Sequence, residues 1–208
     1  MPIFATRMKF ITLPYKGKLV GLYRTFDKKS FVTTEVIKLS LTLAGIPGDR
    51  HSGFHKSAGV REKNLYSKGI PIANHRQWSA LSVEELEQIA DKMGLDDISP
   101  TFIGANFLIE GIPFFTQLPP LTRLRIGNGK LQSTLVVYEE NLPCKFPEEE
   151  MKKAGLNPTG DRFPIAALNR RGLVGWVENG GRIMPGDSVE VQVPVHWAEK
   201  VKELWPKK

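Results

Sequence analysis

Hydrophobic and polar residues alternate in several short stretches of the chain, a pattern typical of strands with one buried face. The clearest stretches are residues 36–43 and 189–195. Two further apolar runs, residues 121–126 and 131–138, flank an Asn128-Gly129 dipeptide that favours a tight hairpin. Short strands joined by many turns, with few helices, predict a mainly β fold: a closed antiparallel β-barrel with a few peripheral helices.

Three helices are expected beside the strands. Ser82 and Glu85 form an S-x-x-E capping box before an apolar stripe that reaches Met93, and Gly94 supplies the stop signal. A second helix is predicted over residues 147–154, with a proline at its start and lysines near its end. A third, at about 197–205, places its apolar residues on one face, as in core packing.

Between the turn at residues 45–48 and Ser79 the chain is polar and irregular, and it contains three of the four histidines. A polar segment of this length predicts a loop that is functional or mobile. No internal repeat interrupts the chain. We therefore expect its 208 residues to form one domain, with a core at about residues 35–193.

Charge and cysteine content narrow the functional classes. The formal net charge of +7 favours anionic partners, although lysine and arginine are scattered and form no basic block. A single cysteine forms no internal disulfide, which favours a reducing compartment. No apolar run approaches the roughly 20 residues of a membrane span, and the N-terminal residues do not resemble a signal peptide. These features predict a cytoplasmic protein without a membrane partner.

Cys144 is the best candidate for a residue that does chemistry. It follows a predicted strand and precedes a predicted helix, between Pro143 and Lys145. Helix N-terminal N–H groups and a neighbouring cation favour the reactive thiolate, whereas glutamates in the helix oppose it. The alternative is a small buried hydrophobic residue, as lone cysteines often are. We predict a reactive thiolate whose replacement removes function without unfolding the protein.

A second candidate site follows the first strand, at Gly48, Asp49, Arg50 and His51. Glycine permits close backbone approach and arginine offers a planar fork for a phosphate or a pterin edge. A turn with a solvated Asp49–Arg50 pair is the simpler interpretation. We expect this loop to lie near Cys144, because the ends of neighbouring barrel strands share one rim.

Two other kinds of site lack their usual sequence signals. His51, His55 and His75 have no partner residues at zinc-finger spacing. A serine hydrolase would require a G-x-S-x-G elbow, and the chain has none.

Four motifs occur in order and together resemble the MOSC domain, the C-terminal domain of molybdenum cofactor sulfurases, which also exists as stand-alone bacterial proteins. The motifs are Gly48-Asp49-Arg50-His51, Gly104-x-Asn106, Pro143-Cys144 and Gly181-x-Ile183-x-Pro185-Gly186-Asp187-x-Val189. Each motif alone is weak, and the ordered set with the Pro-Cys pair is specific. The resemblance covers about residues 35–193.

The resemblance implies a β-barrel that binds the molybdenum cofactor (molybdopterin), an anionic pterin phosphate. Cys144 matches the family cysteine, which is proposed to carry sulfur or to ligate molybdenum. His51 would act as a proton donor or support the cysteine. The residues expected to hold the cofactor are Gly48, Asp49, Arg50, Arg76 and Asn106.

The resemblance also implies partners and relatives. In fused sulfurases a separate pyridoxal-phosphate domain generates the sulfur, so we expect pyridoxal phosphate only through a partner such as a cysteine desulfurase; a redox partner is the alternative. Relatives include reductases of N-hydroxylated compounds. One departure is Gly104-Ala105-Asn106, where many members have Gly-Glu-Asn. An acidic role of that glutamate therefore does not transfer.

Two functions compete with sulfur transfer or molybdenum-dependent reduction. One is a binding module that anchors the cofactor, or another anionic ligand, through Cys144 without turnover. The other is a nucleic-acid-binding barrel, whose affinity would fall steeply with salt. The latter would place aromatic residues among lysines and arginines on strand faces, and the sequence lacks this pattern.

Overall fold

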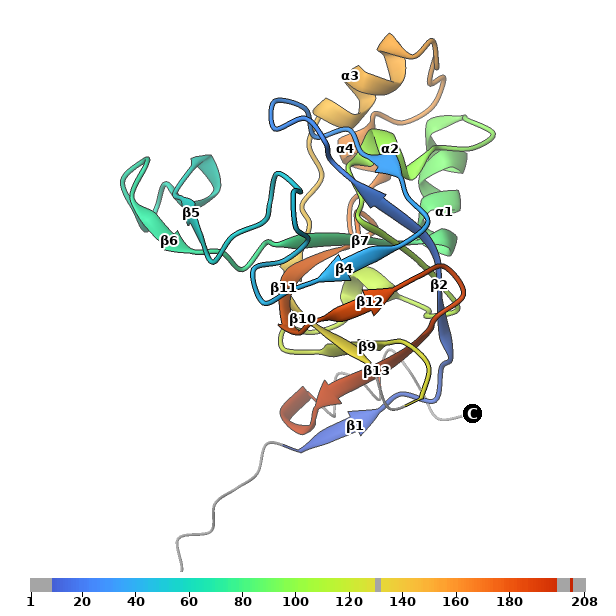
Figure 1. Cartoon of the computed structure of the whole chain (residues 1–208). Helices are drawn as coiled ribbons and strands as arrows, with labels where there is room; N and C mark the ends of the chain where they lie inside the picture. Colours follow the sequence, from blue (N-terminus) through green and yellow to red (C-terminus); the bar gives the residue numbers. More distant parts are fainter. Residues whose placement is uncertain (1–8, 130–131, 198–202, 204–208) are drawn as a thin grey trace, which may run out of the picture.

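Seven strands close into a β-barrel within the part of the chain that the computed structural model describes, residues 9–129, 132–197 and 203 (Figure 1). In sheet order they run β13–β9–β10–β11–β7–β8–β2, and pairing of β2 with β13 closes the ring. Only β7 and β8 pair in parallel among these seven. Their bounds are β2 Gly17–Arg24, β7 Trp78–Ser82, β8 Phe107–Glu110, β9 Arg123–Ile126, β10 Ser133–Glu140, β11 Leu173–Asn179 and β13 Ser188–Pro194. The predicted closed, mainly antiparallel barrel is confirmed.

Six shorter strands lie around the barrel. β1 (Phe10–Thr12) pairs with β13, and β3 (Thr34–Glu35) pairs with β2. β4 (Leu39–Leu41) and β12 (Gly181–Ile183) form a separate two-stranded sheet. β5 (His55–Ser57) and β6 (Pro71–Ala73) form a second one, which projects from the barrel in Figure 1. We call residues 54–74, which contain this pair, the arm.

Alternating strand residues fill the barrel interior. Leu124 of β9 stands opposite Leu135 of β10 and Val191 of β13, and all three are fully buried. The rings of Trp78 and Phe107, on neighbouring β7 and β8, pack with centroids 6.1 Å apart. Burial of each such side chain contributes about 2 kcal/mol to folding. The interior is thus a packed core.

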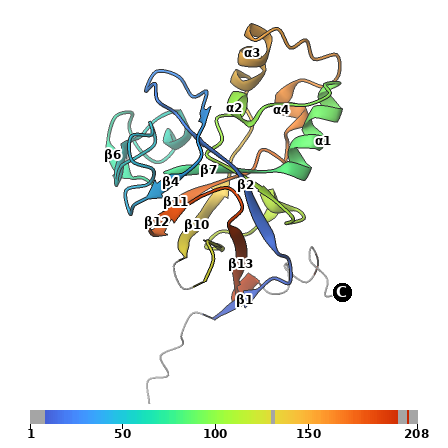
Figure 2. The ribbon, with the colours of Figure 1, turned by 45° about the vertical axis from the view of Figure 1, so that its right-hand side comes forward.

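Helices form a second apolar cluster outside the barrel. These helices are α1 (Val83–Met93), α2 (Pro100–Ile103), α3 (Phe146–Lys153) and α4 (Phe163–Ala166). Figure 2 shows them gathered on one side of the barrel, above the strands. Ile89 and Met93 of α1 share this cluster with Met151 of α3 and Phe163 of α4. As predicted, α1, the helix with the clearest signals in the sequence, packs against the outside of the barrel.

The predicted boundaries of α1 are confirmed. Ser82 is the N-cap and its hydroxyl accepts a hydrogen bond from the Glu85 N–H, while Gly94 ends the helix in the left-handed conformation. Half of the predicted capping box is wrong, because the Glu85 carboxylate turns to Thr116 and accepts hydrogen bonds from it. Glu85 therefore bonds to a buried residue from a distant segment and not to the backbone of its own N-cap.

The predicted strand over residues 36–43 is too long. Only Leu39–Leu41 forms a strand, and Ile37 and Leu43 at its two ends are exposed. Its partner strand, β12, is three residues long, so the alternating residues on either side of Leu39–Leu41 have no strand to pair with. The predicted irregular loop up to Ser79 is also wrong in part, since it contains β5, β6 and the start of β7.

The hairpin around Asn128-Gly129 and the helix near residues 147–154 are confirmed. β9 and β10 pair antiparallel across the turn, although Leu131 lies outside the described residues. The C-terminal helix predicted at 197–205 falls almost entirely on residues that the structure does not describe. Among the described residues no helix has the length and apolar character needed to cross a membrane.

Candidate functional site: a cysteine among arginines

Cys144 lies in the extended connection between β10 and α3, four residues after the strand ends at Glu140. It is partly exposed and forms no disulfide. Lys145, the residue before α3, forms an ion pair with Glu149 across 3.0 Å.

Asn141 ties the cysteine segment to two neighbouring elements. Its backbone N–H donates to the Gly172 carbonyl at 2.9 Å and continues the β10–β11 ladder beyond the last strand pair. Its side-chain Oδ1 accepts a hydrogen bond from Arg76 Nη2 at 2.8 Å. Arg76 also donates to Glu139 through Nη1 at 2.7 Å. This hydrogen bonding brings Arg76 and the 171–172 segment to the connection that carries Cys144.

Arg171 is a buried cation beside the cysteine. Its Nη2 donates to the Ile103 carbonyl at the end of α2, at 2.6 Å. Its Nε and Nη1 are shielded from solvent, and no described residue accepts a hydrogen bond from either. Burial lowers the pKa of Arg171 to about 10, and the neighbouring Cys144, when ionised, opposes that shift. Two unpartnered N–H donors in a buried guanidinium call for a nearby anion.

The position of Arg171 depends on a glycine and a glutamate. Gly172 has φ of +84°, and a Cβ there would lie 2.0 Å from the Ala80 carbonyl oxygen. Its N–H donates to the Thr116 hydroxyl at 2.8 Å, and that hydroxyl donates to Glu85 Oε2 at 2.6 Å. Glu85 is thus linked through two hydrogen bonds to the residue next to Arg171.

A third arginine comes from the arm. Arg61 lies in a short 3-10 helix, Val60–Glu62, and its positive charge lowers the pKa of both Arg76 and Arg171, after the larger effect of burial. The adjacent Glu62 forms an ion pair with Lys56 within the arm. We call Cys144, Asn141, Arg61, Arg76 and Arg171 the Cys144 cluster. The cluster contains guanidinium groups from three segments, and the Cys144 thiol interacts electrostatically with that of Arg171.

The 48–51 loop forms a different arrangement around a buried carboxylate. Asp49 Oδ2 accepts hydrogen bonds from the Thr25 N–H at 2.9 Å and from Asn106 Nδ2 at 3.2 Å. Asp49 Oδ1 accepts from the His51 N–H at 2.9 Å and faces His51 Nδ1 at 3.2 Å. We call these four residues the Asp49 cluster. Burial alone would raise the pKa of Asp49, but the hydrogen bonds from His51 and Thr25 outweigh it and lower the pKa.

Asn106 uses its whole side-chain amide within the fold. Its Oδ1 accepts from the Ser79 N–H at 3.0 Å, and its Nδ2 donates to the Tyr23 carbonyl as well as to Asp49. It therefore joins β2, β7 and the 48–51 loop. Arg50 and Gly48 are exposed at the rim of this loop. Asn74 connects the loop with the Cys144 cluster, since it donates to the His51 carbonyl and accepts from the Arg76 N–H.

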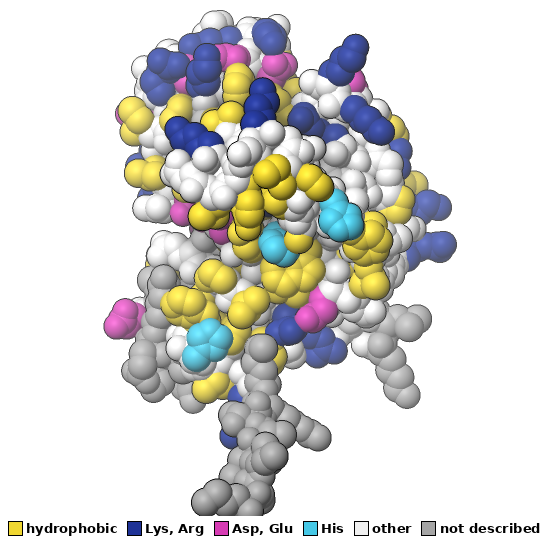
Figure 3. Space-filling view, turned by 90° about the vertical axis from the view of Figure 1, so that its left-hand side faces the viewer, with side chains coloured by type: hydrophobic (Ala, Val, Ile, Leu, Met, Phe, Trp, Pro, Cys, Tyr) yellow, Lys and Arg dark blue, Asp and Glu magenta, His cyan; other side chains and the backbone are white. Residues whose placement is uncertain are grey.

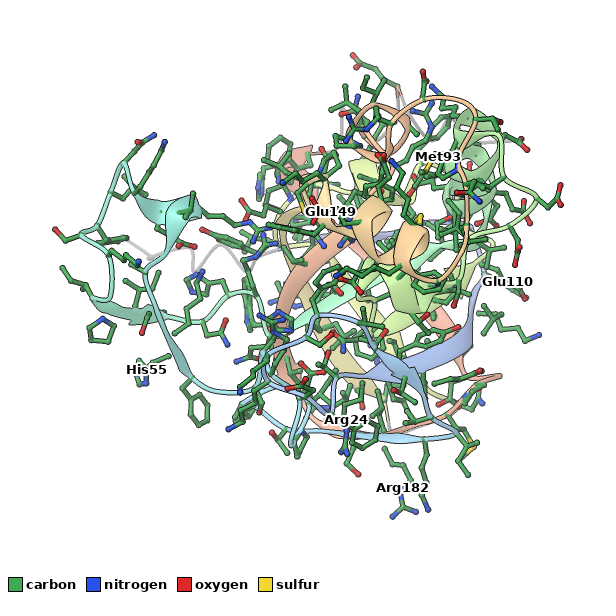
Figure 4. All side chains as sticks on the ribbon, turned by 90° about the horizontal axis from the view of Figure 1, so that it is seen from above. Arg24, His55, Met93, Glu110, Glu149 and Arg182 are labelled. Atoms are coloured by element: carbon green, nitrogen blue, oxygen red, sulfur yellow. The ribbon has the colours of Figure 1, made fainter. Side chains whose placement is uncertain are left out.

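The three histidines of the segment have separate surroundings. His75 packs between Tyr138 and Trp176, with ring centroids 5.0 and 5.5 Å away. His55 points outward from the arm in Figure 4, and His51 belongs to the Asp49 cluster. Among the described residues no group of three or more His, Cys, Asp or Glu side chains is placed to hold a metal ion.

The structure thus separates the predicted site residues into two clusters. Arg76 lies with Cys144, whereas Asp49, His51 and Asn106 form a hydrogen-bonded unit of their own. Sequence reasoning missed Arg61, Arg171 and Asn141. For Arg171 the sequence offered one signal, the Arg170-Arg171-Gly172 run before β11, which places two cations beside a flexible glycine.

A cavity of about 510 Å³ lies between α1 and the 3-10 helix Phe115–Gln117, and its lining includes none of the predicted site residues.

Similarity to known proteins settles the family. The sequence pattern of the MOSC domain matches residues 67–190, more than half of the chain. This chain belongs to the MOSC domain family. YuaD of Bacillus subtilis (strain 168), described as a candidate metal-sulfur cluster biosynthesis protein, is 40% identical over 177 residues, which cover 84% of this chain and 90% of YuaD.

Similar solved structures agree with the barrel. The crystal structure of YuaD from Bacillus subtilis superposes with a TM-score of 0.80 at 37% identity and covers 89% of this chain and 99% of YuaD. YiiM from Escherichia coli has a TM-score of 0.53 at 15% identity, covering 92% of this chain and 79% of YiiM. The latter similarity shows a shared fold alone.

Proposed function

We propose that this MOSC protein carries sulfur as a persulfide on Cys144, for the assembly of a molybdenum-cofactor or metal–sulfur centre. The observation that supports the proposal is the buried Arg171, whose Nε and Nη1 lack acceptors among the described residues, close to the chain's single thiol. A thiolate or persulfide anion would supply the missing negative charge. The described role of YuaD in metal-sulfur cluster biosynthesis is compatible with this activity.

The sulfur transfer requires a thiolate at Cys144 and a positive charge that stabilises it. The Cys144 sulfur attacks the outer sulfur of a persulfide donor, a new S–S bond forms, and the donor leaves as a thiolate. Arg171 would stabilise the negative charge at Cys144 before and after transfer. A cysteine desulfurase, with its own pyridoxal phosphate, is the expected donor, and the cytoplasm the expected compartment.

Binding of the molybdenum cofactor is the second function we propose, with Cys144 as the anchor. The residues are compatible with such a group, because three arginines, one with two buried N–H donors that no described residue accepts from, suit an anionic pterin phosphate. Arg61, Arg76 and Arg171 would hold the anionic part, with Cys144 as the one molybdenum ligand. When bound, the cofactor would supply two-electron redox chemistry, as in reduction of N-hydroxylated compounds.

Two measurements on protein from a host that makes the cofactor separate these functions. Incubation with a cysteine desulfurase and L-cysteine should add one sulfur atom to Cys144, seen by intact and peptide mass spectrometry. Cys144→Ser should add none. Metal and pterin analysis of the purified protein tests cofactor binding. An unmodified Cys144 after desulfurase treatment would contradict sulfur carriage, and stoichiometric molybdenum with pterin would favour the second function.

A further inference from the structure

A smaller recess, of about 310 Å³, lies where the small β4–β12 sheet meets the end of β2. Its lining includes three cations from separate segments: Arg24 at the end of β2, Lys38 just before β4 and Arg182 in β12. Arg24 and Arg182 lie together in the lower part of Figure 4. Among the described residues, no carboxylate lines the recess or forms an ion pair with any of these three cations. We call it the β4–β12 recess.

The register of the β4–β12 sheet places two of the cations on one face. Arg182 stands opposite Ser40, and Lys38 precedes Ser40 by two residues, so all three side chains are directed to the same side. Leu39 and Ile183, which alternate with them, are buried in the barrel core. Packing of these two apolar side chains therefore fixes a backbone that holds two like charges beside each other.

Arg24 reaches the recess from the barrel and is held by contacts of its own. Its Nη1 donates to the Pro47 carbonyl at 3.2 Å, and its guanidinium carbon lies 4.1 Å from the centroid of the Phe26 ring. Its Nε is shielded from solvent, and no described residue accepts a hydrogen bond from it. The guanidinium is thus fixed in place with part of its hydrogen-bonding capacity unused, in contrast to a freely solvated surface arginine.

The apolar part of the lining strengthens the effect of these charges. Ile46 and Leu39 line the recess and are almost completely shielded from solvent. A recess lined by charges of one sign, with low-dielectric walls, concentrates the electric field and raises the local concentration of anions. A bound anion would also relieve the mutual repulsion of the three cations.

We propose that the β4–β12 recess is a binding site for a phosphate dianion, either free or as the phosphate group of a small molecule. Arg24 and Arg182 would donate guanidinium N–H groups to the phosphate oxygens, and Lys38 would contribute a further positive charge. A volume of about 310 Å³ is at the lower end of the range for small-molecule sites. No lining residue belongs to the Cys144 cluster, so this site goes beyond the proposed function and does not depend on it.

A general attraction of anions to a basic surface is the alternative that the test must exclude. The chain has a formal net charge of +7, and Figure 3 shows lysine and arginine side chains spread over the upper half of the face on the side of the arm. Such an attraction would depend on the total charge. A site in the recess would instead depend on the particular cations that line it.

The test is isothermal titration calorimetry of the full chain at pH 8 and low salt, with inorganic phosphate and phenyl phosphate as the probes. Lys38→Met and Arg182→Met should each weaken binding by about tenfold, because each removes a charged donor from the recess. Both residues are exposed, so the variants should keep the native stability in urea. Lys68→Met is the matched control, since it removes the same charge from the exposed arm, and its affinity should stay within about twofold of the native value. Cys144→Ser should bind as the native chain does.

Saturable binding at one site, weakened by Lys38→Met and Arg182→Met but not by Lys68→Met, would support the proposal. Tighter binding of phenyl phosphate would then assign the recess to a phosphorylated molecule, and tighter binding of inorganic phosphate would assign it to the free ion. Absence of saturable binding, or equal weakening by Lys38→Met and Lys68→Met, would overturn the site and leave only general attraction to the surface. Sulfur loading of Cys144 is measured separately, so the proposed function stands or fails independently of this result.

Discussion

The Asp49 cluster and the Cys144 cluster both bring together polar residues from distant segments, but they differ in how completely their buried charged side chains, Asp49 and Arg171, are satisfied. Both carboxylate oxygens of Asp49 accept hydrogen bonds from within the protein, and the Asn106 amide is fully used. In Arg171 two buried N–H groups have no acceptor among the described residues. A satisfied buried group holds the fold together, whereas an unsatisfied one indicates a place where a ligand or an ionised group completes the structure.

The comparison changes the interpretation of the motif residues. Asp49 and Asn106 are part of the resemblance to the MOSC family, yet their side chains contact the backbone of β2 and β7. A cofactor that bound to Asp49 or Asn106 would have to compete with these hydrogen bonds.

Arg76 connects the two clusters, because its backbone N–H donates to Asn74 and its guanidinium donates to Asn141.

The largest expected effect is at Cys144. Cys144→Ala should abolish sulfur loading from every donor, because the chain has no other thiol. The free energy of unfolding should change by less than about 1 kcal/mol, since the side chain is partly exposed. Mass spectrometry and urea unfolding give the two readouts. An alanine variant that no longer folds would instead identify Cys144 as a core residue.

The next largest effect is at Asp49 and concerns stability. Asp49→Ala removes the acceptor for the Thr25 N–H and the Asn106 amide and leaves these donors buried. We expect a loss of about 3 kcal/mol or more in the free energy of unfolding. Arg50→Ala is the matched control, because Arg50 is the exposed neighbour and should cost less than about 0.5 kcal/mol. Equal stability of the two variants in urea would contradict the structural role of Asp49.

The Arg50 control also sharpens the functional comparison. If the 48–51 loop holds an anionic cofactor, Arg50→Ala should weaken cofactor retention without changing stability. Unchanged pterin content in that variant would assign ligand binding to the Cys144 cluster alone.

The third effect depends on pH. Burial raises the pKa of Glu85 to about 7, although the hydrogen bonds from Thr116 and the charge of Arg170 oppose the shift and Glu84 adds to it. The folded protein therefore retains a proton that the unfolded chain loses near pH 4.5. The contribution of Glu85 should fall as pH rises from about 4.5 to about 7, by at most about 3 kcal/mol.

Glu85→Gln should remove this dependence and leave the variant relatively more stable at pH 8 than at pH 5. Urea unfolding of the native chain and of the variant at the two pH values measures the difference. Glu87→Gln on the exposed face of α1 is the control and should leave the pH profile as in the native chain. If the free energy of unfolding of the native chain instead increased from pH 5 to pH 8, and Glu85→Gln removed that increase, the raised pKa of Glu85 would be refuted.

Local signals made much of the fold predictable. The Asn128-Gly129 turn and the cap at Ser82 are each determined by residues a few positions apart, so they do not depend on contacts with distant segments. β2 went unpredicted because its burial on both sides leaves no clear alternation. Residues 36–43 show the reverse case, since alternation alone does not provide a partner strand.

The candidate site was only half predictable for the same physical reason. Cys144 could be found from its neighbours in sequence, between a strand and a helix. For Arg171 the Arg170-Arg171-Gly172 run was only a weak signal, because the importance of Arg171 lies in its burial and in missing acceptors, which depend on contacts with distant segments such as the end of α2. Glu85 shows how tertiary contacts can override a local signal, since its expected cap partner lost to Thr116.

Only a small change in stability is expected at the residue that matters most to the comparison, Arg171. Arg171→Met removes a buried charge with two unpartnered donors and loses one hydrogen bond to the Ile103 carbonyl. These effects oppose each other, so the free energy of unfolding should stay within about 1 kcal/mol of the native value. The proposed sulfur carriage assigns Arg171 the role of stabilising a Cys144 thiolate, so alkylation by iodoacetamide at pH 7 should be roughly severalfold slower in the variant than in the native chain. A variant that is strongly destabilised but alkylates at the native rate would place Arg171 with Asp49 as a structural residue, and the contrast between the two clusters would no longer hold.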